Sequence, residues 1–253
     1  MALTRVPGRE VHFRVHGAGP LLLVQPGLYQ VGPQWTDLGY TGALAGEYTV
    51  VEIDPLGHGR SAAPTDPAAY ELPRRVDDVL AVLDELGADR AVYWGYSMGA
   101  WIGCGLAAYA PDRVAGLVVG GWDPVGGLEV AYEHARRTVP LPPDPDWTAL
   151  ARAAAARVPE QAAVIDAGDP VAFDACHRSL EHQPDLSPAL AALDVPVLLY
   201  AGDADPYHPG ARAVAARIGA GFATVAGCDH TGAWHDATAV LAEVVPFLRT
   251  VAR

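Results

Sequence analysis

The chain has 253 residues, of which 51% are hydrophobic and 19% charged, and this length suits one α/β domain whose core is large enough to need no disulfide or metal staple. Its 17 Lys and Arg residues against 30 Asp and Glu give a net charge of −13, so we expect no nucleic-acid partner, because such a partner needs a surface of clustered positive charge. All the basic residues are Arg, which excludes a Walker A lysine and a Schiff-base lysine.

Short apolar runs typical of strands alternate along the chain with segments of helical periodicity. The expected strands are residues 11–15, 21–24, 48–53, 91–94, 114–119, 195–201 and, more weakly, 222–226. The expected helices are residues 74–86, 98–109, 211–218 and 236–251. Uninterrupted apolar runs are typical of strands buried on both faces of a parallel sheet. The alternation predicts an α/β fold with a doubly wound, mostly parallel sheet.

The uncharged stretch 91–110 has the length of a membrane span. It contains Gly and Ser at five positions, however, and it divides better into a short strand and a helix: Gly95, Ser97, Gly99, Gly103 and Gly105. We therefore expect no membrane partner.

Two further features indicate where the protein works. The first ten residues lack the apolar core of a signal peptide. The three cysteines, Cys104, Cys176 and Cys228, form no C-x-x-C pair, which argues against a thiolate metal site. We expect a cytoplasmic protein with no metal and no cofactor.

The strand pattern is interrupted once, at residues 123–194, where no run resembles a buried strand. Helix-like stretches occupy residues 129–138 and 148–158, on either side of a Pro-rich segment at 139–147. The simplest interpretation is a helical cap inserted into a core made of residues 1–122 and 195–253.

The central motif is Gly95-Tyr96-Ser97-Met98-Gly99, which follows an expected strand and opens an expected helix. A G-x-S-x-G sequence in that context places the serine on a strained turn, with its hydroxyl exposed above the sheet. The small residues on either side are needed because strand and helix approach closely there. The pattern therefore predicts Ser97 as a nucleophile.

With this motif the chain resembles the α/β-hydrolase superfamily, and further segments extend the likeness in the family's order. Residues 54–61, Asp54 to Ser61, resemble its D-x-x-G-x-G-x-S turn, and the strand and loop at residues 21–28 resemble the segment that supplies half of its oxyanion hole. Residues 202–205 resemble the G-x-x-D turn of the acid, and residues 227–230 the loop of the base. The resemblance implies an α/β-hydrolase fold with a cap, and it leaves the subfamily open.

The resemblance also implies site residues. Ser97 would be the nucleophile, His230 the base and Asp205 the acid, while the backbone N–H groups of Leu28 and Met98 would form the oxyanion hole. The oxyanion loop of the family usually begins His-Gly, and here it reads Pro26-Gly27, so loop conformation and substrate preference are where this chain departs from the family.

Other residues compete for these roles. Asp123 and Asp203 also follow expected strands and are rivals of Asp205 for the acid, although the acid of a G-x-x-D turn comes three residues after the glycine. His235 and His208 are rivals of His230 for the base. His235 is expected at the start of the final helix, where a polar residue is common without any catalytic role, and His208 is expected to border the pocket.

Four aromatic residues are expected to face a mainly apolar substrate pocket, with ordinary packing as the alternative: Tyr29, Tyr96, Trp122 and Tyr207. His58 is expected to be a turn residue rather than a base. His12 and His16 alternate on an outer strand face, where we expect them to be solvated.

These residues predict a serine hydrolase that acts on a small-molecule substrate, a small or medium, largely apolar ester, lactone or thioester. Acyl transfer, perhydrolysis and C–C bond hydrolysis by the same triad remain alternatives. A ligand receptor that has lost turnover is a third. The Asp nucleophile of the family's epoxide hydrolases and haloalkane dehalogenases is excluded, because the elbow carries Ser97. The oligomeric state is left open.

Overall fold

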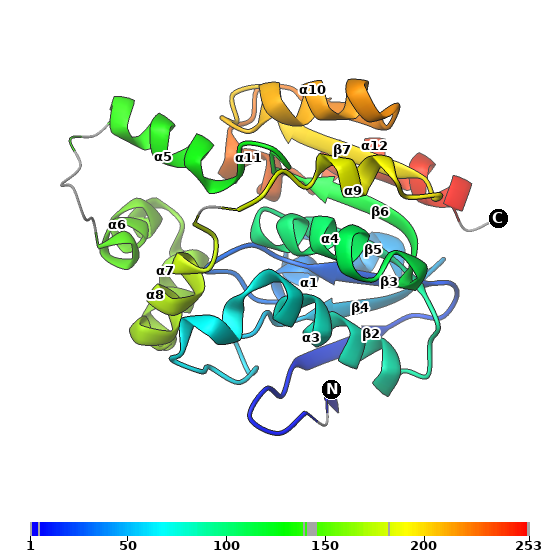
Figure 1. Ribbon diagram of the computed structural model, residues 1–253, viewed down its shortest axis with the longest axis horizontal. Helices are drawn as coiled ribbons and strands as arrows, with labels where there is room; N and C mark the ends of the chain where they lie inside the picture. Colours follow the sequence, from blue (N-terminus) through cyan, green and yellow to red (C-terminus); the bar gives the residue numbers. More distant parts are fainter. Residues whose placement is uncertain (1, 5, 139, 141–145, 182, 252–253) are drawn as a thin grey trace.

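An eight-stranded sheet runs through the middle of the molecule (Figure 1), in the order β1-β2-β4-β3-β5-β6-β7-β8. The computed structural model describes residues 2–4, 6–138, 140, 146–181 and 183–251. The strands are β1 (Ala2–Leu3), β2 (His12–His16), β3 (Leu21–Gln25), β4 (Thr49–Ile53), β5 (Ala91–Tyr96), β6 (Val114–Gly120), β7 (Val197–Gly202) and β8 (Gly221–Val225). The pairs β1–β2 and β2–β4 are antiparallel and all the others are parallel, which confirms the doubly wound, mostly parallel sheet.

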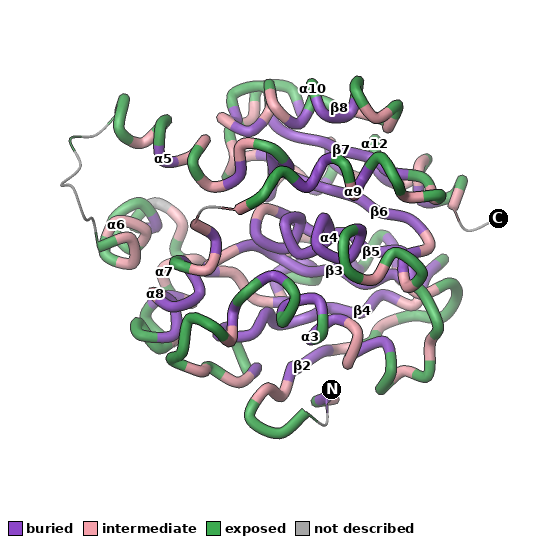
Figure 2. The backbone as a smooth tube through the Cα atoms, in the orientation of Figure 1, coloured by how far each residue is buried: buried purple, intermediate pink, exposed green. Residues whose placement is uncertain are grey.

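Helices cover both faces of this sheet (Figure 1). One face carries α3 (Leu72–Glu85), α4 (Met98–Tyr109), α9 (Ser187–Ala191) and α10 (His208–Ile218), with the 3-10 turns η1 (Pro67–Tyr70) and η2 (Pro111–Arg113) nearby. The other carries α1 (Gln34–Asp37), α2 (Tyr40–Leu44), α11 (His230–His235) and α12 (Ala237–Val251). Each face therefore has its own apolar core, and the central strands are buried on both sides (Figure 2).

The core behind the sheet is built around Trp35. Its ring meets those of Trp94 and Trp234 edge to face, with centroids 5.0 and 4.9 Å apart. Trp94 comes from β5 and Trp234 from α11, so this cluster ties the loop after β3 to the strand and the helix that carry the site described below. Edge-to-face aromatic pairs each add about 0.5–1.5 kcal/mol beyond the area they bury.

Between β6 and β7 the chain leaves the sheet and forms α5 (Gly127–Thr138), α6 (Trp147–Ala154), η3 (Ala155–Arg157), α7 (Pro159–Ala167) and α8 (Pro170–Arg178). Figure 1 shows them grouped beyond one end of the strands. Among the described residues of 123–194 none is in a strand, in keeping with the expected helical cap, whose limits at 123 and 194 stay a prediction. Most of the Pro-rich stretch, residues 139 and 141–145, and residue 182 lie outside the described residues.

Stacked rings join three of the helices between β6 and β7. Tyr132 of α5 lies flat on Trp147 of α6, with centroids 4.1 Å apart, and His177 of α8 stacks on Trp147 at 5.3 Å. Burial lowers the pKa of His177 to about 4, so this ring is neutral at neutral pH and stacks as an uncharged aromatic.

The expected elements agree with the structure to within a few residues, but the expectation for His12 is wrong. Its ring is buried at 4% exposure, and Nδ1 lies 2.9 Å from Oδ2 of Asp54. The reason is that β2 is not an outer edge here: β1 pairs with its far side, and the turn after β4 covers it. His16 lies further along β2, half-exposed, with Nε2 3.2 Å from Glu52.

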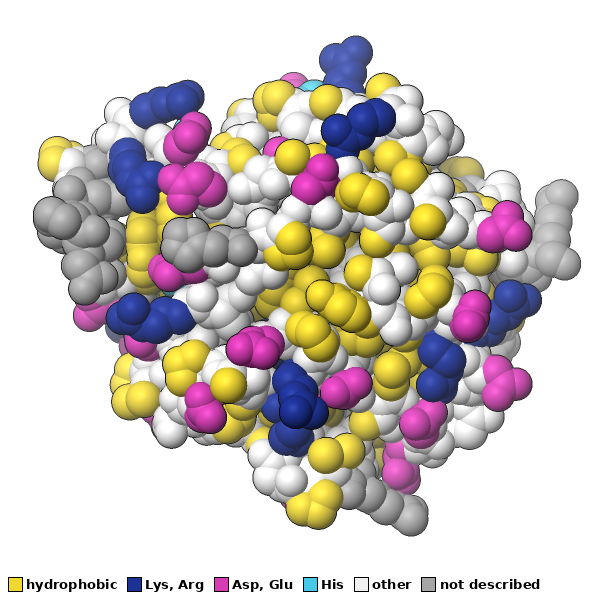
Figure 3. Space-filling view, in the orientation of Figure 1, with side chains coloured by type: hydrophobic (Ala, Val, Ile, Leu, Met, Phe, Trp, Pro, Cys, Tyr) yellow, Lys and Arg dark blue, Asp and Glu magenta, His cyan; other side chains and the backbone are white. Residues whose placement is uncertain are grey.

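The uncharged stretch 91–110 forms β5 and α4. No helix in the described parts of the chain is both long enough and apolar enough to cross a membrane. On the face drawn in Figure 3, hydrophobic side chains gather near the middle, over α4 and its neighbours, with charged side chains of both signs around them.

Candidate active site

The turn between β5 and α4 places Ser97 in a backbone conformation that few residues other than glycine adopt. Ser97 has φ 54° and ψ −117°, and its N–H donates to the carbonyl of Gly120 at 2.8 Å. A side chain at Gly95 would collide with the backbone of Gly99, and one at Gly99 with the carbonyl of Gln25. The two glycines let strand, helix and loop meet, and a non-glycine residue in such a conformation stores about 1–3 kcal/mol of strain.

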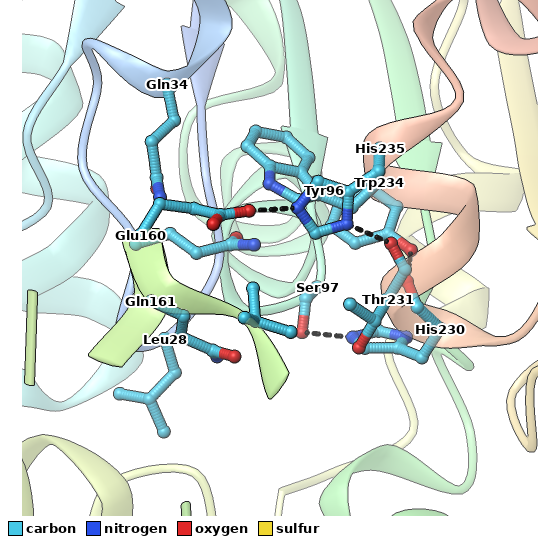
Figure 4. Close-up of a pocket in the computed structure, with 12 residues that line it drawn as sticks. Leu28, Gln34, Tyr96, Ser97, Glu160, Gln161, His230, Thr231, Trp234 and His235 are labelled. Atoms are coloured by element: carbon cyan, nitrogen blue, oxygen red, sulfur yellow. Dashed lines mark hydrogen bonds and ion pairs between the residues drawn. The ribbon is translucent and has the colours of Figure 1, made fainter. Parts of the chain in front are cut away.

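A continuous chain of hydrogen bonds starts at the hydroxyl of Ser97. Its Oγ lies 3.1 Å from Nε2 of His230, and Nδ1 of His230 lies 2.8 Å from Oδ2 of Asp205 (Figure 4 shows the first of these). Asp205 is buried at 2% exposure, and its other oxygen accepts the N–H of Tyr207 at 3.0 Å. A carboxylate fixed in this way holds the Nδ1–H tautomer of the imidazole, so that Nε2 is free to take a proton from the serine.

Three elements bring these residues together from distant parts of the sequence. Ser97 follows β5, Asp205 follows β7, and His230 opens α11 after β8. Each stands at the carboxyl end of a parallel strand, the edge where open α/β sheets place their ligands. The hydroxyl of Tyr96 donates a hydrogen bond to the backbone carbonyl of His230, which holds the backbone of the histidine in place.

The two rival acids lie elsewhere. Asp203 is exposed. Asp123 is buried, but its Oδ1 accepts the N–H of Val125, and a side chain at Gly210 would collide with its carboxylate. Asp123 therefore holds the start of the segment that leads into α5.

The two rival bases are also engaged away from Ser97. His208 contacts Thr224 at 2.9 Å through Nε2 and packs on Phe222, so it does not border the pocket as expected. His235 ends α11 rather than opening the final helix, and its Nε2 lies 2.7 Å from Glu160 of α7.

The loop after β3 passes directly over the serine. A Cβ at Gly27 would lie 2.9 Å from Cβ and 3.4 Å from Oγ of Ser97, so the peptide between Gly27 and Leu28 adjoins the Ser97 side chain. Met98 is the first residue of α4, where the backbone N–H has no partner inside the helix. The N–H groups of Leu28 and Met98 are therefore on the two backbone segments that flank the Ser97 hydroxyl.

This loop is held by the turn between β4 and α3. The backbone of Tyr29 is left-handed, with φ 60°, and its N–H donates to Nε2 of His58 at 3.0 Å. Asp54 accepts the N–H of Gly32 at 2.8 Å. Two hydrogen bonds thus tie the loop that carries Leu28 to the turn at residues 54–61.

His58 is buried and contacted on two sides. It is 2% exposed, Phe173 of α8 packs on its ring at 4.9 Å, and Nδ1 faces the carbonyl of Leu56 at 3.2 Å. Burial, with a smaller effect from the nearby Arg75, lowers the pKa of His58 to about 3. The ring is therefore neutral, with its hydrogen on Nδ1 and its Nε2 lone pair available to Tyr29.

Two chambers meet at Ser97 and His230. The larger has a volume of about 240 Å³ and is lined mainly by apolar side chains of the core and the cap: Leu28, Met98, Trp122, Leu128, Ala131, Leu180, Pro206 and Tyr207. His134 also reaches it. This space exceeds the roughly 150 Å³ of a cavity known to hold benzene, so it can take a short hydrocarbon chain or a ring.

The smaller chamber has a volume of about 120 Å³ and a more polar lining (Figure 4). Its lining comes from the loop after β3, the start of α1, the end of β5, α7 with the residue before it, and α11: Leu28, Gln30, Gln34, Tyr96, Val158, Glu160, Gln161, Thr231, Trp234 and His235. The two chambers give the serine one apolar and one polar side.

Of the four aromatic residues expected in the pocket, three line a chamber: Tyr96 the polar one, Trp122 and Tyr207 the apolar one. The expectation for Tyr29 is wrong. Its left-handed backbone turns the side chain away from the serine, so that the ring packs on Phe173 at 5.2 Å and the hydroxyl lies 3.5 Å from Thr148.

Several residues of the site were not expected from the sequence. The polar side chains of the smaller chamber, Gln30, Gln34, Glu160 and Gln161, carry no motif. His58 stood in a motif, but its hydrogen bond to Tyr29 depends on how two loops pack. Among the described residues, no group of three His, Cys, Asp or Glu side chains is placed to hold a metal ion.

The chain is similar in sequence to a family of known proteins and to several hydrolases. The model of the alpha/beta hydrolase fold family matches residues 20–191. Epoxide hydrolase B of Mycobacterium tuberculosis is 35% identical over 128 residues, which are 50% of this chain and 33% of that protein. 3-Oxoadipate enol-lactonase 2 of Acinetobacter baylyi is 28% identical over 173 residues, 63% of this chain and 62% of that one. The chain thus spans between a third and two thirds of these relatives.

Among solved structures, the enol-lactonase from Burkholderia xenovorans LB400 superimposes with a TM-score of 0.79 at 26% identity. The alignment covers 98% of this chain and all of that one. The likeness therefore includes both the sheet and the helices inserted between β6 and β7.

Proposed function

Because the chain belongs to the alpha/beta hydrolase fold family, we propose that it is a serine hydrolase that cleaves a small or medium, largely apolar ester, lactone or thioester. One observation carries the proposal: the unbroken hydrogen-bond chain from Ser97 through His230 to Asp205. Ser97 and His230 line both chambers, which leave room for the acyl and the alcohol or thiol parts of an ester or thioester.

In the proposed reaction the hydroxyl of Ser97 attacks the carbonyl carbon of the substrate. Nε2 of His230 takes the hydroxyl proton as the bond forms, and Asp205 stabilises the imidazolium that results. His230 then returns the proton to the leaving alcohol or thiol, which leaves an acyl-enzyme on Ser97. Water, activated by the same imidazole, releases the acid and restores the serine.

Negative charge develops on the carbonyl oxygen during both steps. The N–H groups of Leu28 and Met98 are the donors we assign to it. Each donor of this kind is worth about 3 kcal/mol, or a factor of about 10²–10³ in rate. Since Leu28 sits on the loop fixed by His58 and Asp54, the turn at 54–61 positions one of the two donors.

The alternatives use the same residues. Acyl transfer or perhydrolysis would follow if the cap kept water from the acyl-enzyme, and C–C bond hydrolysis would use the same nucleophile. The similarity to an epoxide hydrolase concerns the fold and half of this chain. Ser97 stands where that chemistry uses Asp in the family, so ester chemistry is favoured. A ligand receptor would keep the site without turnover.

Two measurements test the proposal. A fluorophosphonate probe should label the wild type on Ser97 and fail to label Ser97→Ala, with circular dichroism showing that the variant is folded. p-Nitrophenyl esters of increasing acyl length should be hydrolysed, with kcat reduced at least about 10⁴-fold in Ser97→Ala. Labelling at another serine, or labelling of Ser97 without any turnover, would contradict an esterase and favour, respectively, a different nucleophile or a receptor.

A further inference from the structure

Two glutamine side chains give the polar chamber hydrogen-bond donors, and the triad does not need them. Oε1 of Gln30 accepts the backbone N–H of Gly27 at 2.6 Å, and Oε1 of Gln34 accepts that of Val31 at 3.0 Å. Because a backbone N–H can only donate, these contacts fix which end of each amide is oxygen. The amide nitrogens, which carry the donors, are left for other partners. Both glutamines line the chamber, so they offer it hydrogen-bond donors.

The charges around the chamber are already paired with each other. Glu160, near the start of α7, lies 2.7 Å from Nε2 of His235, and Nδ1 of that ring faces the carbonyl of Thr231 at 2.8 Å (Figure 4). The backbone at the start of α7, and to a smaller extent His235, lowers the pKa of Glu160, so the carboxyl group is ionised at neutral pH.

An anionic ligand would therefore meet unfavourable surroundings. The described residues that line the chamber include no Arg, and their only cationic candidates are His235, engaged with Glu160, and His230, which must be neutral to accept a proton. A carboxylate in the chamber would lose its hydration, find no unpaired positive charge and lie near a fixed negative one. The net charge of −13 adds to this effect. An uncharged group with acceptor atoms meets the glutamine donors without that penalty.

Building on the proposed hydrolase function, we propose that the polar chamber is the subsite for a small uncharged group with a hydrogen-bond acceptor, such as an amide or ester carbonyl, and that it discriminates against a carboxylate. The hydrocarbon part of the same substrate lies in the apolar chamber. The substrate class is then a neutral ester, lactone or thioester with one short polar arm and one apolar arm. Glu160 and Gln34 are its specificity-determining residues.

Matched substrates test this inference on the wild-type protein. Methyl succinamate and monomethyl succinate carry an amide or a carboxylate on the acyl side of the ester, and O-butyryl glycolamide and O-butyryl glycolate carry them on the alcohol side. Hydrolysis is followed by pH-stat. In the pair whose polar arm enters the chamber, we expect kcat/KM for the amide to exceed that for the carboxylate at least tenfold. Equal values within both pairs, or a preference for the carboxylate, would overturn the inference.

Two variants assign the effect to the chamber. Glu160→Gln removes the fixed negative charge, and the ratio of amide to carboxylate should fall at least threefold. Glu133→Gln, an exposed carboxylate on α5 paired with Arg137, is the matched control and should leave the ratio unchanged. Gln34→Glu keeps an acceptor for Val31 but loses the donors, so kcat/KM for the amide should fall at least tenfold. Ratios unaffected by both Glu160→Gln and Gln34→Glu would place the discrimination elsewhere and overturn the assignment.

The outcome is separable from that of the proposed function. Fluorophosphonate labelling and turnover of p-nitrophenyl butyrate report on the chemistry of Ser97 with a substrate that has no polar arm. If both are absent, the hydrolase proposal fails. If both are present and no amide preference is seen, the hydrolase proposal stands and the subsite inference alone is wrong.

Discussion

Nε2 of His58 accepts a hydrogen bond from the backbone N–H of Tyr29 at 3.0 Å. Tyr29 directly follows Leu28, whose own N–H is assigned to the oxyanion. In the proposed mechanism His58 is thus a positioning residue: it fixes the Leu28–Tyr29 peptide, which directly follows the Gly27–Leu28 peptide that would face the oxyanion.

The first prediction removes this support. In His58→Leu the N–H of Tyr29 loses its acceptor, the loop shifts, and kcat on p-nitrophenyl butyrate should fall about ten- to a hundredfold, a fraction of the effect of a lost oxyanion donor. KM should change less than threefold, because most of the residues that line the two chambers lie outside this loop. His58→Gln restores an acceptor and should recover most of kcat. His208→Ala, which alters a histidine outside the site, is the control. If His58→Leu raises KM and leaves kcat unchanged, the positioning role is wrong.

The second prediction concerns acid stability. The pKa of His58 is about 3 in the folded chain and near 6.5 when it is unfolded. Between these values the unfolded state binds the extra proton, so the free energy of unfolding decreases as the pH falls from about 6.5 to 3. The contribution of a buried group shifted this far is on the order of a few kcal/mol. His177, whose pKa is about 4, acts in the same direction.

Urea denaturation at several pH values measures this effect. Asp78 has the opposite sign: burial raises its pKa to about 6, so its contribution to stability increases as the pH falls from 6 to about 4 and offsets part of the histidine effect. His58→Gln, which cannot titrate, should flatten the loss of stability between pH 6.5 and 4. The same pH dependence in His58→Gln as in the wild type would show that another group is responsible.

The third prediction separates the three carboxylates. Asp205→Asn should reduce kcat by about 10⁴, because the amide no longer selects the correct imidazole tautomer. Asp123→Asn and Asp203→Asn should each reduce it less than about tenfold, since neither carboxylate reaches His230 in the structure. Steady-state kinetics on one p-nitrophenyl ester compare all three variants. A crippled Asp123→Asn beside an active Asp205→Asn would move the acid to the turn after β6.

The fourth prediction separates the two histidines of α11. His230→Ala should abolish both turnover and fluorophosphonate labelling, since no other described base contacts Ser97. His235→Ala should still be labelled, because the ring it loses is bonded to Glu160 and not to the serine. Its kinetics on substrates with a polar arm should change instead. Equal loss of labelling in both variants, with native circular dichroism, would remove the distinction.

The fifth prediction concerns the cap. Ala131 of α5 lines the apolar chamber, so Ala131→Phe fills part of it and should shift the preferred p-nitrophenyl ester towards shorter acyl chains, with kcat/KM for acetate changed less than threefold. Glu133→Phe, two residues along the same helix and facing solvent, should leave the preference unchanged. An unaltered chain-length profile in Ala131→Phe would mean that the acyl chain lies elsewhere.

The mostly parallel sheet and the family could be predicted from the sequence because their signals are local. The uninterrupted apolar runs of β5 and β7 and the turn around Ser97 carry their own pattern. The ion pair of Glu160 and His235 joins α7, which lies between β6 and β7, to α11 near the end of the chain. No local sequence pattern predicts such a contact, because it depends on how α7 packs against α11.

The expectations for His12 and Tyr29 were wrong for related reasons. Alternation predicted a strand at residues 11–15, one residue from β2, but it could not show that β1 and the turn after β4 would cover His12. The direction of the Tyr29 side chain depends on a positive φ in a loop of non-glycine residues, which composition does not reveal. In both places tertiary packing decides what the sequence leaves open.

Two hydrogen bonds, from the N–H of Gly32 to Asp54 and from the N–H of Tyr29 to His58, make two separate stretches of chain into one exchangeable unit. A chimaera that receives the His-Gly loop of a relative at positions 26–32, but keeps its own turn at 54–61, would combine a loop and a turn whose side chains do not match each other. Transplanting both stretches together carries the contact along with them. A substitution in one stretch should therefore restrict which substitutions the other can accept.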